Sequence, residues 1–338
     1  MASLNQADAA PTAGNDSSAR ELPPVSVLVR SYHRREHMLK LVAAVLDQDH
    51  PCFEIIVVEQ SEWSAEERAP LDALAEKDSR LRVIYSKPLG LGGCRDEFLS
   101  QAQHAILLSF DDDDLPLGSS IVSGHARNYL DPTIVAVTGR HVYDPDEQCG
   151  YNRFRARRSC LRYNFFGYPH AFCRLDERIE SVHWVHGTNG SIRAEVVHRV
   201  GGWGESTEHD EHPLCLQLQN QLLPGERLVF DPSIKLLRNK DIPGGAAVRW
   251  AGPRRIFANW LRYYHRLVIP NRRVRSIPIY PLFPLASAFS AARWVWKEAK
   301  SYESYRQRLF AIAMTIAAWP LWYLAEVFGR SVHPLERR

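Results

Sequence analysis

Four consecutive aspartates, at positions 111–114, follow the apolar stretch 105–108 and are closed by Leu115 and Pro116. An apolar run bounded by proline predicts a buried strand, so the carboxylates stand where a central strand leaves its sheet. Open α/β sheets bind ligands at that edge. Adjacent carboxylates repel one another unless a cation lies between them, and Mg²⁺ or Mn²⁺ prefers such oxygen ligands together with substrate phosphates. The run predicts a metal site that binds a nucleotide or diphosphate; the alternative is a solvated acidic turn with an aspartate helix cap.

Composition bounds the class of protein. With 338 residues, 45% of them apolar and 24% charged, the chain can form one large α/β domain with appendages. A net charge of +3 is too small to indicate a nucleic-acid polymer as partner. The six cysteines contain no C-x-x-C pair, which argues against a zinc ribbon or a disulfide framework and favours reduced thiols in a cytoplasmic protein.

The two ends of the chain differ in character. Residues 1–20 are rich in Ala, Asp, Asn and Ser, and they predict a disordered tail rather than a signal peptide. Two uncharged stretches, 276–292 and 309–325, are at the short limit of what spans a bilayer, and arginines precede both. They predict peripheral membrane contact over 276–325, at the cytoplasmic face. The alternative is a helical pair packed on the catalytic domain or on a second subunit.

Between these ends, apolar strands alternate with segments of helical spacing. Strands are predicted at 25–29, 53–58, 81–85, 105–110 and 133–137, and helices at 36–47, 65–77, 92–103 and 119–129. This alternation favours a doubly wound α/β fold with a parallel sheet. Periodicity fades over 139–182, which predicts an inserted region that faces substrate. Its arginine-rich stretch 153–162 could bind RNA, but a pyrophosphate-linked lipid acceptor or an anionic membrane is the more economical partner, and a solvated loop is the alternative.

Five short motifs follow one another in a recognisable order. They are 25–34 (VSVLVRSYHR), 54–61 (EIIVVEQS), 90–96 (GLGGCRD), 111–113 (DDD), and a later block of 187–193 (GTNGSIR), 200–203 (VGGW) and 210–211 (DE). In this order and spacing they resemble family 2 glycosyltransferases over roughly residues 24–235. The resemblance implies a GT-A-like fold with a doubly wound mixed sheet. It also implies transfer of a sugar from a nucleoside diphosphate with inversion and with a divalent metal.

Composition and the resemblance together predict a domain organisation. A disordered tail covers 1–22, and a GT-A-like domain covers 23–240, with a nucleotide-binding half at 23–138 and an acceptor half at 139–240. A C-terminal helical region, which contains the apolar stretches, covers 241–338. The expected partners are a nucleoside-diphosphate sugar and a glycan or lipid-linked saccharide acceptor. Donor sugar, linkage and oligomeric state are not defined by the sequence.

The acids divide into metal ligands and a base. The chemistry needs a cation against the leaving diphosphate, and Asp113 is expected as the direct ligand of Mg²⁺ or Mn²⁺, with Asp111 turned toward ribose or a metal-bound water. The attacking hydroxyl must lose a proton, and Asp210 or Glu211 is the expected general base. Register with the family pattern favours Glu211. The alternative is that both are N-terminal acids that interact with a helix dipole.

The nucleotide is expected at the ends of the first two strands. Glu59 stands where the family usually has an aspartate that contacts the base, and a carboxylate can accept the N3–H of uracil or thymine, so UDP- or dTDP-sugars are favoured. Arg95 offers a fork of donors to the diphosphate or to the aspartates. The expected nucleotide-binding residues are Ser31, Tyr32, Arg34, Glu59, Arg95, Asp111 and Asp112.

One position departs from the family pattern. Members often place a histidine that helps hold the metal after the strand predicted at 229–237, but this chain has Arg238 and Lys240 there. Either carboxylates and phosphates complete the metal shell, or these cations neutralise the diphosphate directly. Two other functions stay open: a non-catalytic protein of the same fold that binds nucleotide sugars or polyanions, and a nucleotidyltransferase, which also uses strand-end aspartates with metal.

Overall fold

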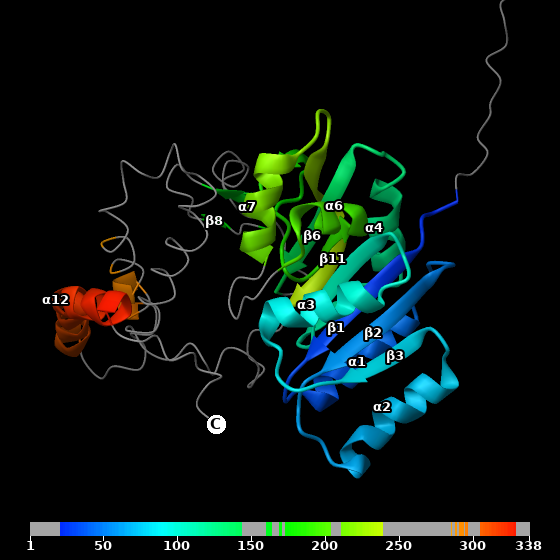
Figure 1. Ribbon diagram of the computed structural model, residues 1–338, viewed down its shortest axis with the longest axis horizontal. Coiled ribbons are helices and arrows are strands. Elements are labelled where there is room, and N and C mark those ends of the chain that lie inside the picture. Colours follow the sequence, from blue (N-terminus) through cyan, green and yellow to red (C-terminus); the bar gives the residue numbers. More distant parts are fainter. Residues whose placement is uncertain are drawn as a thin grey trace, which may run out of the picture.

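The computed structural model describes residues 21–143, 160–163, 169–170, 173–203, 211–238 and 305–328, with single positions between 285 and 296. Strands and helices alternate through the first half of the chain (Figure 1). Its elements are β1 (Val25–Ser31), α1 (Arg35–Leu46), β2 (Phe53–Glu59), α2 (Ala65–Lys77), β3 (Leu81–Tyr85), α3 (Gly90–Gln101), β4 (Ile106–Asp111), β5 (Asp114–Pro116), α4 (Ile121–Asn128) and β6 (Ile134–Val142).

The second half returns to the same sheet with shorter elements. In chain order these are β7 (Arg162–Tyr163), β8 (Pro169–His170), β9 (Ile179–Val182), β10 (Gly190–Arg193), α6 (Ala194–Val200), α7 (Glu211–Gln221), β11 (Arg227–Arg238) and α12 (Tyr305–Phe328). In Figure 1, α12 lies to one side of the sheet and its covering helices. Within the described residues, no helix combines the length and the apolar character needed to cross a membrane.

The central sheet is mixed. Its strand order is β3-β2-β1-β4-β10-β6-β11-β5, with β9 paired to β11. The first four strands run parallel to one another, whereas β10 is antiparallel to both of its neighbours, β4 and β6. Strand β11 is parallel to β6 and antiparallel to β5 and β9. The expected mixed α/β sheet is therefore confirmed, while a purely parallel sheet is wrong because β10 enters between β4 and β6.

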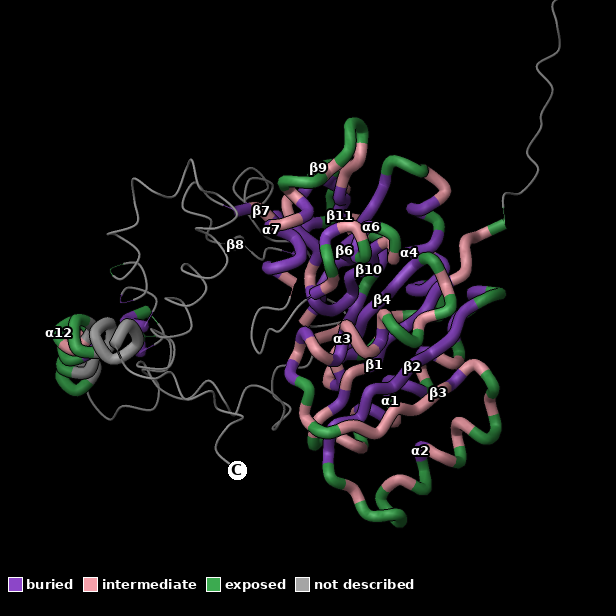
Figure 2. The backbone as a smooth tube through the Cα atoms, in the orientation of Figure 1, coloured by how far each residue is buried: buried purple, intermediate pink, exposed green. Residues whose placement is uncertain are grey.

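Alternate residues of the central strands belong to two cores, one on each face of the sheet. The backbone of β1 and β2 is coloured mostly as buried in Figure 2. In β1, Val27 joins the core beneath α1, α2 and α4, and its neighbour Leu28 joins the core beneath α3, α6 and α7. This follows from the period of two in an extended chain. Because both faces are covered, the strands are nearly continuous apolar runs, and polar side chains are concentrated where the strands end.

Most predicted elements of the first half are confirmed. The helix at 65–77 and the strand at 81–85 have the predicted bounds, and the strand predicted at 133–137 continues to Val142. The second apolar stretch lies in α12. Residues 1–20, most of 139–178 and most of 239–304 lie wholly or largely outside the described residues, so the domain boundaries at 22 and 240 stay predictions.

Candidate functional site

The candidate site is built on the carboxyl ends of three neighbouring parallel strands. Backbone register pairs Ser31 at the end of β1 with Glu59 at the end of β2, and Arg30 with Asp111 at the end of β4. Parallel strands bring their carboxyl ends to one edge of a sheet, so residues distant in sequence meet there. The structure thus brings together the predicted strand-end residues Ser31, Glu59 and Asp111.

Arginines enclose the aspartate run. Arg30 contacts Asp111 Oδ1 at 2.6 Å, and one nitrogen of Arg34 lies 2.9 Å from Asp112 and 2.8 Å from Asp113. Asp112 also accepts the Tyr32 backbone N–H at 3.1 Å. The four carboxylates are largely buried, the most exposed, that of Asp111, being at 21%. The solvated acidic turn is therefore wrong, because these acids are desolvated and paired.

The aspartates differ in pKa because burial raises the value at three of them, whereas ion pairs lower it at Asp111. Desolvation raises the pKa of Asp112 to about 6 against the opposing effect of Arg34, and it raises the pKa of Asp113 and Asp114. At Asp111, Arg30 and Arg238 outweigh desolvation and hold the pKa below its usual value. Asp111 is thus the acid most firmly kept as a carboxylate.

A divalent metal fits this group. Ligand oxygens of Asp111, Asp113 and Asp114 lie within 4.8 Å of one another. Asp113 Oδ1 is buried and has no hydrogen-bond partner in the described part of the chain. Hard cations such as Mg²⁺ and Mn²⁺ accept one or two carboxylates and complete their shell with phosphates and water. An unpartnered buried carboxylate oxygen is the feature expected of such a ligand, and it belongs to the aspartate predicted as the direct one.

Two further unpartnered oxygens lie at the ends of β1 and β2. Glu59 is fully buried, and its Oε1 accepts the Ser61 N–H at 2.6 Å, whereas its Oε2 has no partner among the described residues. The buried Ser31 hydroxyl also has none. Unsatisfied buried polar atoms are uncommon and destabilising unless a ligand completes them. A base carrying N–H groups would complete both, although nucleotide contact stays a prediction.

Arg95 is buried and braces a loop. Its Nη1 donates to Ser109 Oγ at 2.7 Å, and its Nη2 donates to the Gly187 carbonyl. The guanidinium carbon is 5.6 Å from the centre of the Trp203 ring. Arg95 also helps to lower the pKa of Asp111. Its predicted contact with a diphosphate is untested, and its visible partners belong to the protein.

Glu211 is the first residue of α7, and its carboxylate approaches the aspartate edge. A Cβ built on Gly187 would lie 3.1 Å from Arg95 Nη2, 3.3 Å from Glu211 Oε2 and 3.7 Å from Arg30 Nη2. Since Arg30 pairs with Asp111, the acid from α7 lies beside the arginine that holds the strand-end aspartate. Asp210, the other predicted base, lies outside the described residues.

Several participants were missed by sequence reasoning. Thr188 Oγ1 accepts the Asp111 N–H at 3.1 Å and donates to Asp114 Oδ2 at 2.7 Å. Arg30 lies in the first motif, 25–34, but the motif predicts no role for it. A charge inside an otherwise apolar strand needs a buried partner, and this signal could have identified it.

A buried network positions the loop that contains Thr188. His125 Nε2–H donates to Asn189 Oδ1 at 3.0 Å, while Ser191 Oγ lies 2.8 Å from His125 Nδ1 and 2.8 Å from the Tyr129 hydroxyl. Asn189 itself donates to the carbonyls of Arg140 and Ile234. The network therefore joins α4, β6, β10 and β11 behind the aspartates.

A second group of metal-ligating residue types, His141, Cys173 and His186, also comes together. His141 Nε2–H donates to the Thr188 carbonyl, and the Thr188 N–H donates to His186 Nδ1. Desolvation lowers the pKa of His186, with further lowering by Arg30 and Arg238, and desolvation raises the pKa of Cys173. A protonated thiol is a poor metal ligand, and the arginines nearby oppose a further cation. Because both rings bond to the Thr188 backbone, we interpret this group as support for the loop that contains Thr188.

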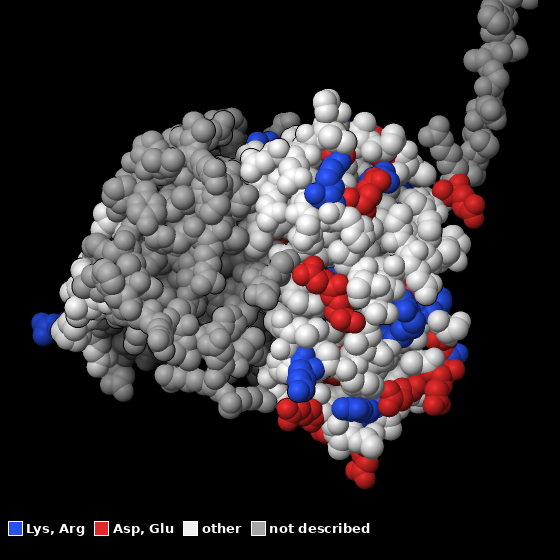
Figure 3. Space-filling model, viewed as in Figure 1, with Lys and Arg blue, Asp and Glu red and all other residues white. Residues whose placement is uncertain are grey.

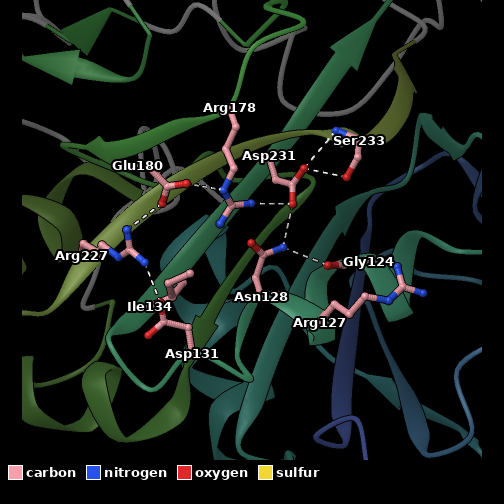
Figure 4. Close-up of a pocket in the computed structure, with 10 residues that line it drawn as sticks. All are labelled: Gly124, Arg127, Asn128, Asp131, Ile134, Arg178, Glu180, Arg227, Asp231 and Ser233. Atoms are coloured by element: carbon pink, nitrogen blue, oxygen red, sulfur yellow. Dashed lines mark hydrogen bonds and ion pairs between the residues drawn. The ribbon is translucent and has the colours of Figure 1, made fainter. Parts of the chain in front are cut away.

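A cavity of about 350 Å³ lies elsewhere, near the first residues of β6 and β11 (Figure 4). Ion pairs fill its wall: Arg178 contacts Asp231 at 2.8 Å, and Arg227 contacts Asp131 and Glu180 at 2.6 and 2.7 Å. On the face shown in Figure 3, acidic and basic side chains are interspersed over the described surface. The aspartate site is at the opposite ends of the strands, so the cavity is not part of it.

The fold and this site define the class of protein. The fold is similar to that of the mannosyltransferase PcManGT from Pyrobaculum calidifontis, solved in complex with GDP-Man and Mn²⁺. That structure aligns with a TM-score of 0.57 and 15% identity, covering 92% of this chain and 88% of that one. TarS 1–349 from S. aureus, in complex with UDP-GlcNAc, aligns with a TM-score of 0.50 and 12% identity over 93% and 77% of the two chains. The fold is that of GT-A glycosyltransferases.

Sequence comparison identifies the family. Residues 26–201, more than half of the chain, match the model of glycosyl transferase family 2, and the chain belongs to this family. The putative teichuronic acid biosynthesis glycosyltransferase TuaG of Bacillus subtilis is 33% identical over 93 residues, which are 27% of this chain and 36% of that protein. An uncharacterized glycosyltransferase of Rickettsia felis is 29% identical over 91 residues, 27% of this chain and 15% of that protein. The chain thus spans only about a third or less of the length of these relatives.

Proposed function

We propose that this protein is an inverting glycosyltransferase. It would transfer a sugar from a nucleoside diphosphate, with UDP- or dTDP-sugars favoured, to a glycan or lipid-linked acceptor. The observation that carries the proposal is the convergence at Gly187, where the Glu211 carboxylate and the Arg30 guanidinium both approach the same backbone position. This convergence supports a role for Glu211 as the base, next to the arginine that pairs with Asp111.

The transfer would be an in-line displacement at the anomeric carbon. The acceptor hydroxyl oxygen forms a bond to the anomeric carbon as the bond from that carbon to the diphosphate oxygen breaks. The hydroxyl proton passes to Glu211, or to Asp210, acting as general base, and the diphosphate leaves with the bonding electrons. Glu59 would accept an N–H of the base. Asp113 would hold Mg²⁺ or Mn²⁺ directly, with Asp111 turned toward ribose or a metal-bound water, and the metal would supply positive charge against the departing diphosphate.

Calorimetric binding of nucleoside diphosphates and their sugars, with and without Mn²⁺, tests the proposal. We expect the native chain to bind one nucleotide, and we expect Mn²⁺ to tighten this binding in the native chain but not in Asp113→Ala. Asp49→Ala is the matched control, because Asp49 is exposed and precedes the opposite end of β2. Sugar transfer by Glu211→Gln and Asp210→Asn would then assign the base.

Each outcome has a definite meaning. Binding without transfer in the native chain would indicate a non-catalytic nucleotide-sugar protein, and consumption of nucleoside triphosphates would indicate a nucleotidyltransferase. An equal effect of Mn²⁺ on nucleotide binding by the native chain and by Asp113→Ala would refute the assignment of Asp113 to a metal site.

We also propose peripheral membrane contact through α12. Large apolar side chains on this helix are exposed, and the exposed Arg306 lies near its start. They are Leu309, Phe310, Met314, Ile316 and Leu321, exposed by 46%, 68%, 52%, 46% and 69%. An apolar surface next to arginine suits an anionic bilayer. The first apolar stretch lies largely outside the described residues, and a place at the cytoplasmic face stays a prediction.

A further inference from the structure

Arg238, the last residue of β11, lies among the aspartates. Antiparallel pairing of β11 with β5 places it opposite Asp114. Its Nε is 3.2 Å from Asp114 Oδ1, and its Nη2 is 3.4 Å from Asp111 Oδ2. One guanidinium therefore bridges two members of the acidic group that could hold a metal.

The oxygens of these aspartates are almost fully engaged. The second oxygen of Asp111 contacts Arg30, and the second oxygen of Asp114 accepts the Thr188 hydroxyl. Both oxygens of Asp112 are paired, with Arg34 and with the Tyr32 N–H, and Asp113 Oδ2 is paired with Arg34. Asp113 Oδ1 is left without a partner in the described chain. A metal would therefore find one carboxylate oxygen open, not the several that a dedicated metal cage presents.

Arginine cannot replace a metal-ligating histidine as a ligand. Its guanidinium is always protonated and has five N–H donors but no acceptor. It can replace the charge, because it forms charge-assisted hydrogen bonds to phosphate. In the described contacts of Arg238 the aspartates engage Nε and Nη2, and Nη1 keeps its two donors for a ligand.

We propose that Arg238 is a built-in cation that binds the diphosphate of the donor, so that nucleotide binding does not depend on a divalent metal. This rests on the proposed function of the site as a nucleoside-diphosphate site. Asp111 and Asp114 orient the guanidinium, and Asp113 alone contributes an open carboxylate to any metal that binds with the phosphates. Arg238 thus provides positive charge that a metal ion held by several carboxylates would otherwise provide.

The test is calorimetric titration with UDP, dTDP and GDP in Mn²⁺ and in EDTA. We expect the native protein to bind one of them in EDTA with a Kd within tenfold of that in Mn²⁺. Arg238→Ala should weaken binding in EDTA by tenfold or more, and Arg238→Lys by less. Arg238→His, which restores a ligand, should bind Mn²⁺ alone more tightly than the native protein and bind the nucleotide only when Mn²⁺ is present.

Arg127→Ala is the matched control. Arg127 lines the remote cavity, its guanidinium points away from the ion pairs there (Figure 4), and removing it should change neither titration. Thermal melts of each variant identify loss of fold, and if Arg238→Ala unfolds, the lysine and histidine variants carry the test.

Nucleotide binding by the native protein that EDTA abolishes would overturn this inference and leave the proposed function intact. Unchanged binding by a folded Arg238→Ala in EDTA would overturn it as well. Absence of nucleotide binding in both buffers would overturn the proposed function and the inference with it.

Discussion

Gly187 is the residue at which the two sides of the candidate site touch. Its carbonyl accepts a hydrogen bond from Arg95 Nη2, and its α-carbon faces the carboxylate of Glu211. A side chain at this position would separate the acid from the arginines without entering either hydrophobic core.

Gly187→Ala is therefore expected to lower kcat for sugar transfer by about tenfold or more, since displaced catalytic groups lose their alignment. The new Cβ would lie 3.1 Å from Arg95 Nη2 and 3.3 Å from Glu211 Oε2, distances that force one of these groups to move. Steady-state kinetics and donor titration measure the effect. Donor affinity should change much less than kcat, and an unaltered transfer rate would show that Glu211 takes no part.

His125 gives the protein a pH dependence of stability. It is fully buried, and desolvation lowers its pKa from the ordinary 6.5 to about 4. As the pH falls, the unfolded chain therefore protonates His125 at a higher pH than the folded chain does. The stability that neutral His125 contributes to the folded state is complete above pH 6.5 and is lost as the pH falls toward 4. The loss would amount to roughly 3 kcal/mol of the free energy of unfolding.

Urea denaturation at pH 7.5 and pH 5 tests this prediction. The native chain should be less stable at pH 5, and His125→Gln, which cannot titrate, should show a smaller difference between the two pH values. An equal difference in both proteins would assign the effect to other groups.

At the scale of single elements, α2 begins with a complete capping box. The Ser64 hydroxyl accepts the Glu67 N–H, and the Glu67 carboxylate accepts the Ser64 N–H. Ser64→Ala should lower the free energy of unfolding by about 1 kcal/mol, as loss of an N-cap usually does. Thermal melts measure this. Nucleotide binding should not change, because α2 packs on the sheet away from the aspartates; a weakened nucleotide affinity would contradict that view.

Elements were predictable from the sequence where their periodicity was long enough. The helix at 65–77 and the strand at 81–85 have clear patterns with turn residues between them. Strand β10 has only four residues, Gly190–Arg193, and it forms because β4 and β6 offer it hydrogen bonds on both sides. No local pattern contains that information.

Some residues of the candidate site can also be predicted from the sequence, and others cannot. Strand-end acids such as Glu59 and Asp111 follow from the pattern, because the ends of parallel strands must meet. Their arginine partners do not: Arg30 lies 81 positions from Asp111, and Arg238 lies 127 positions from it. Such pairings depend on how the complete sheet is assembled.

For the molecule as a whole, α12 provides a test of membrane contact. Co-sedimentation with vesicles of phosphatidylglycerol should recover more protein than vesicles of phosphatidylcholine, because arginines accompany the apolar surface. Phe310→Ser combined with Leu321→Ser should reduce recovery several-fold. Leu223→Ser is the control, since Leu223 is 54% exposed between α7 and β11. Equal recovery of all three proteins would exclude α12 as the contact.

The insertion of β10 between β4 and β6 has a consequence for how the chain reaches this fold. Strand β4 is synthesised long before β10, and until Gly190–Arg193 emerge from the ribosome its outer edge has no hydrogen-bonding neighbour. An unpaired apolar edge is a hazard for aggregation, and pairings between distant segments form slowly. During synthesis the edge of β4 must therefore stay unaggregated until β10 is made. The yield of active protein should then depend on the speed of translation and on chaperones that cover this edge.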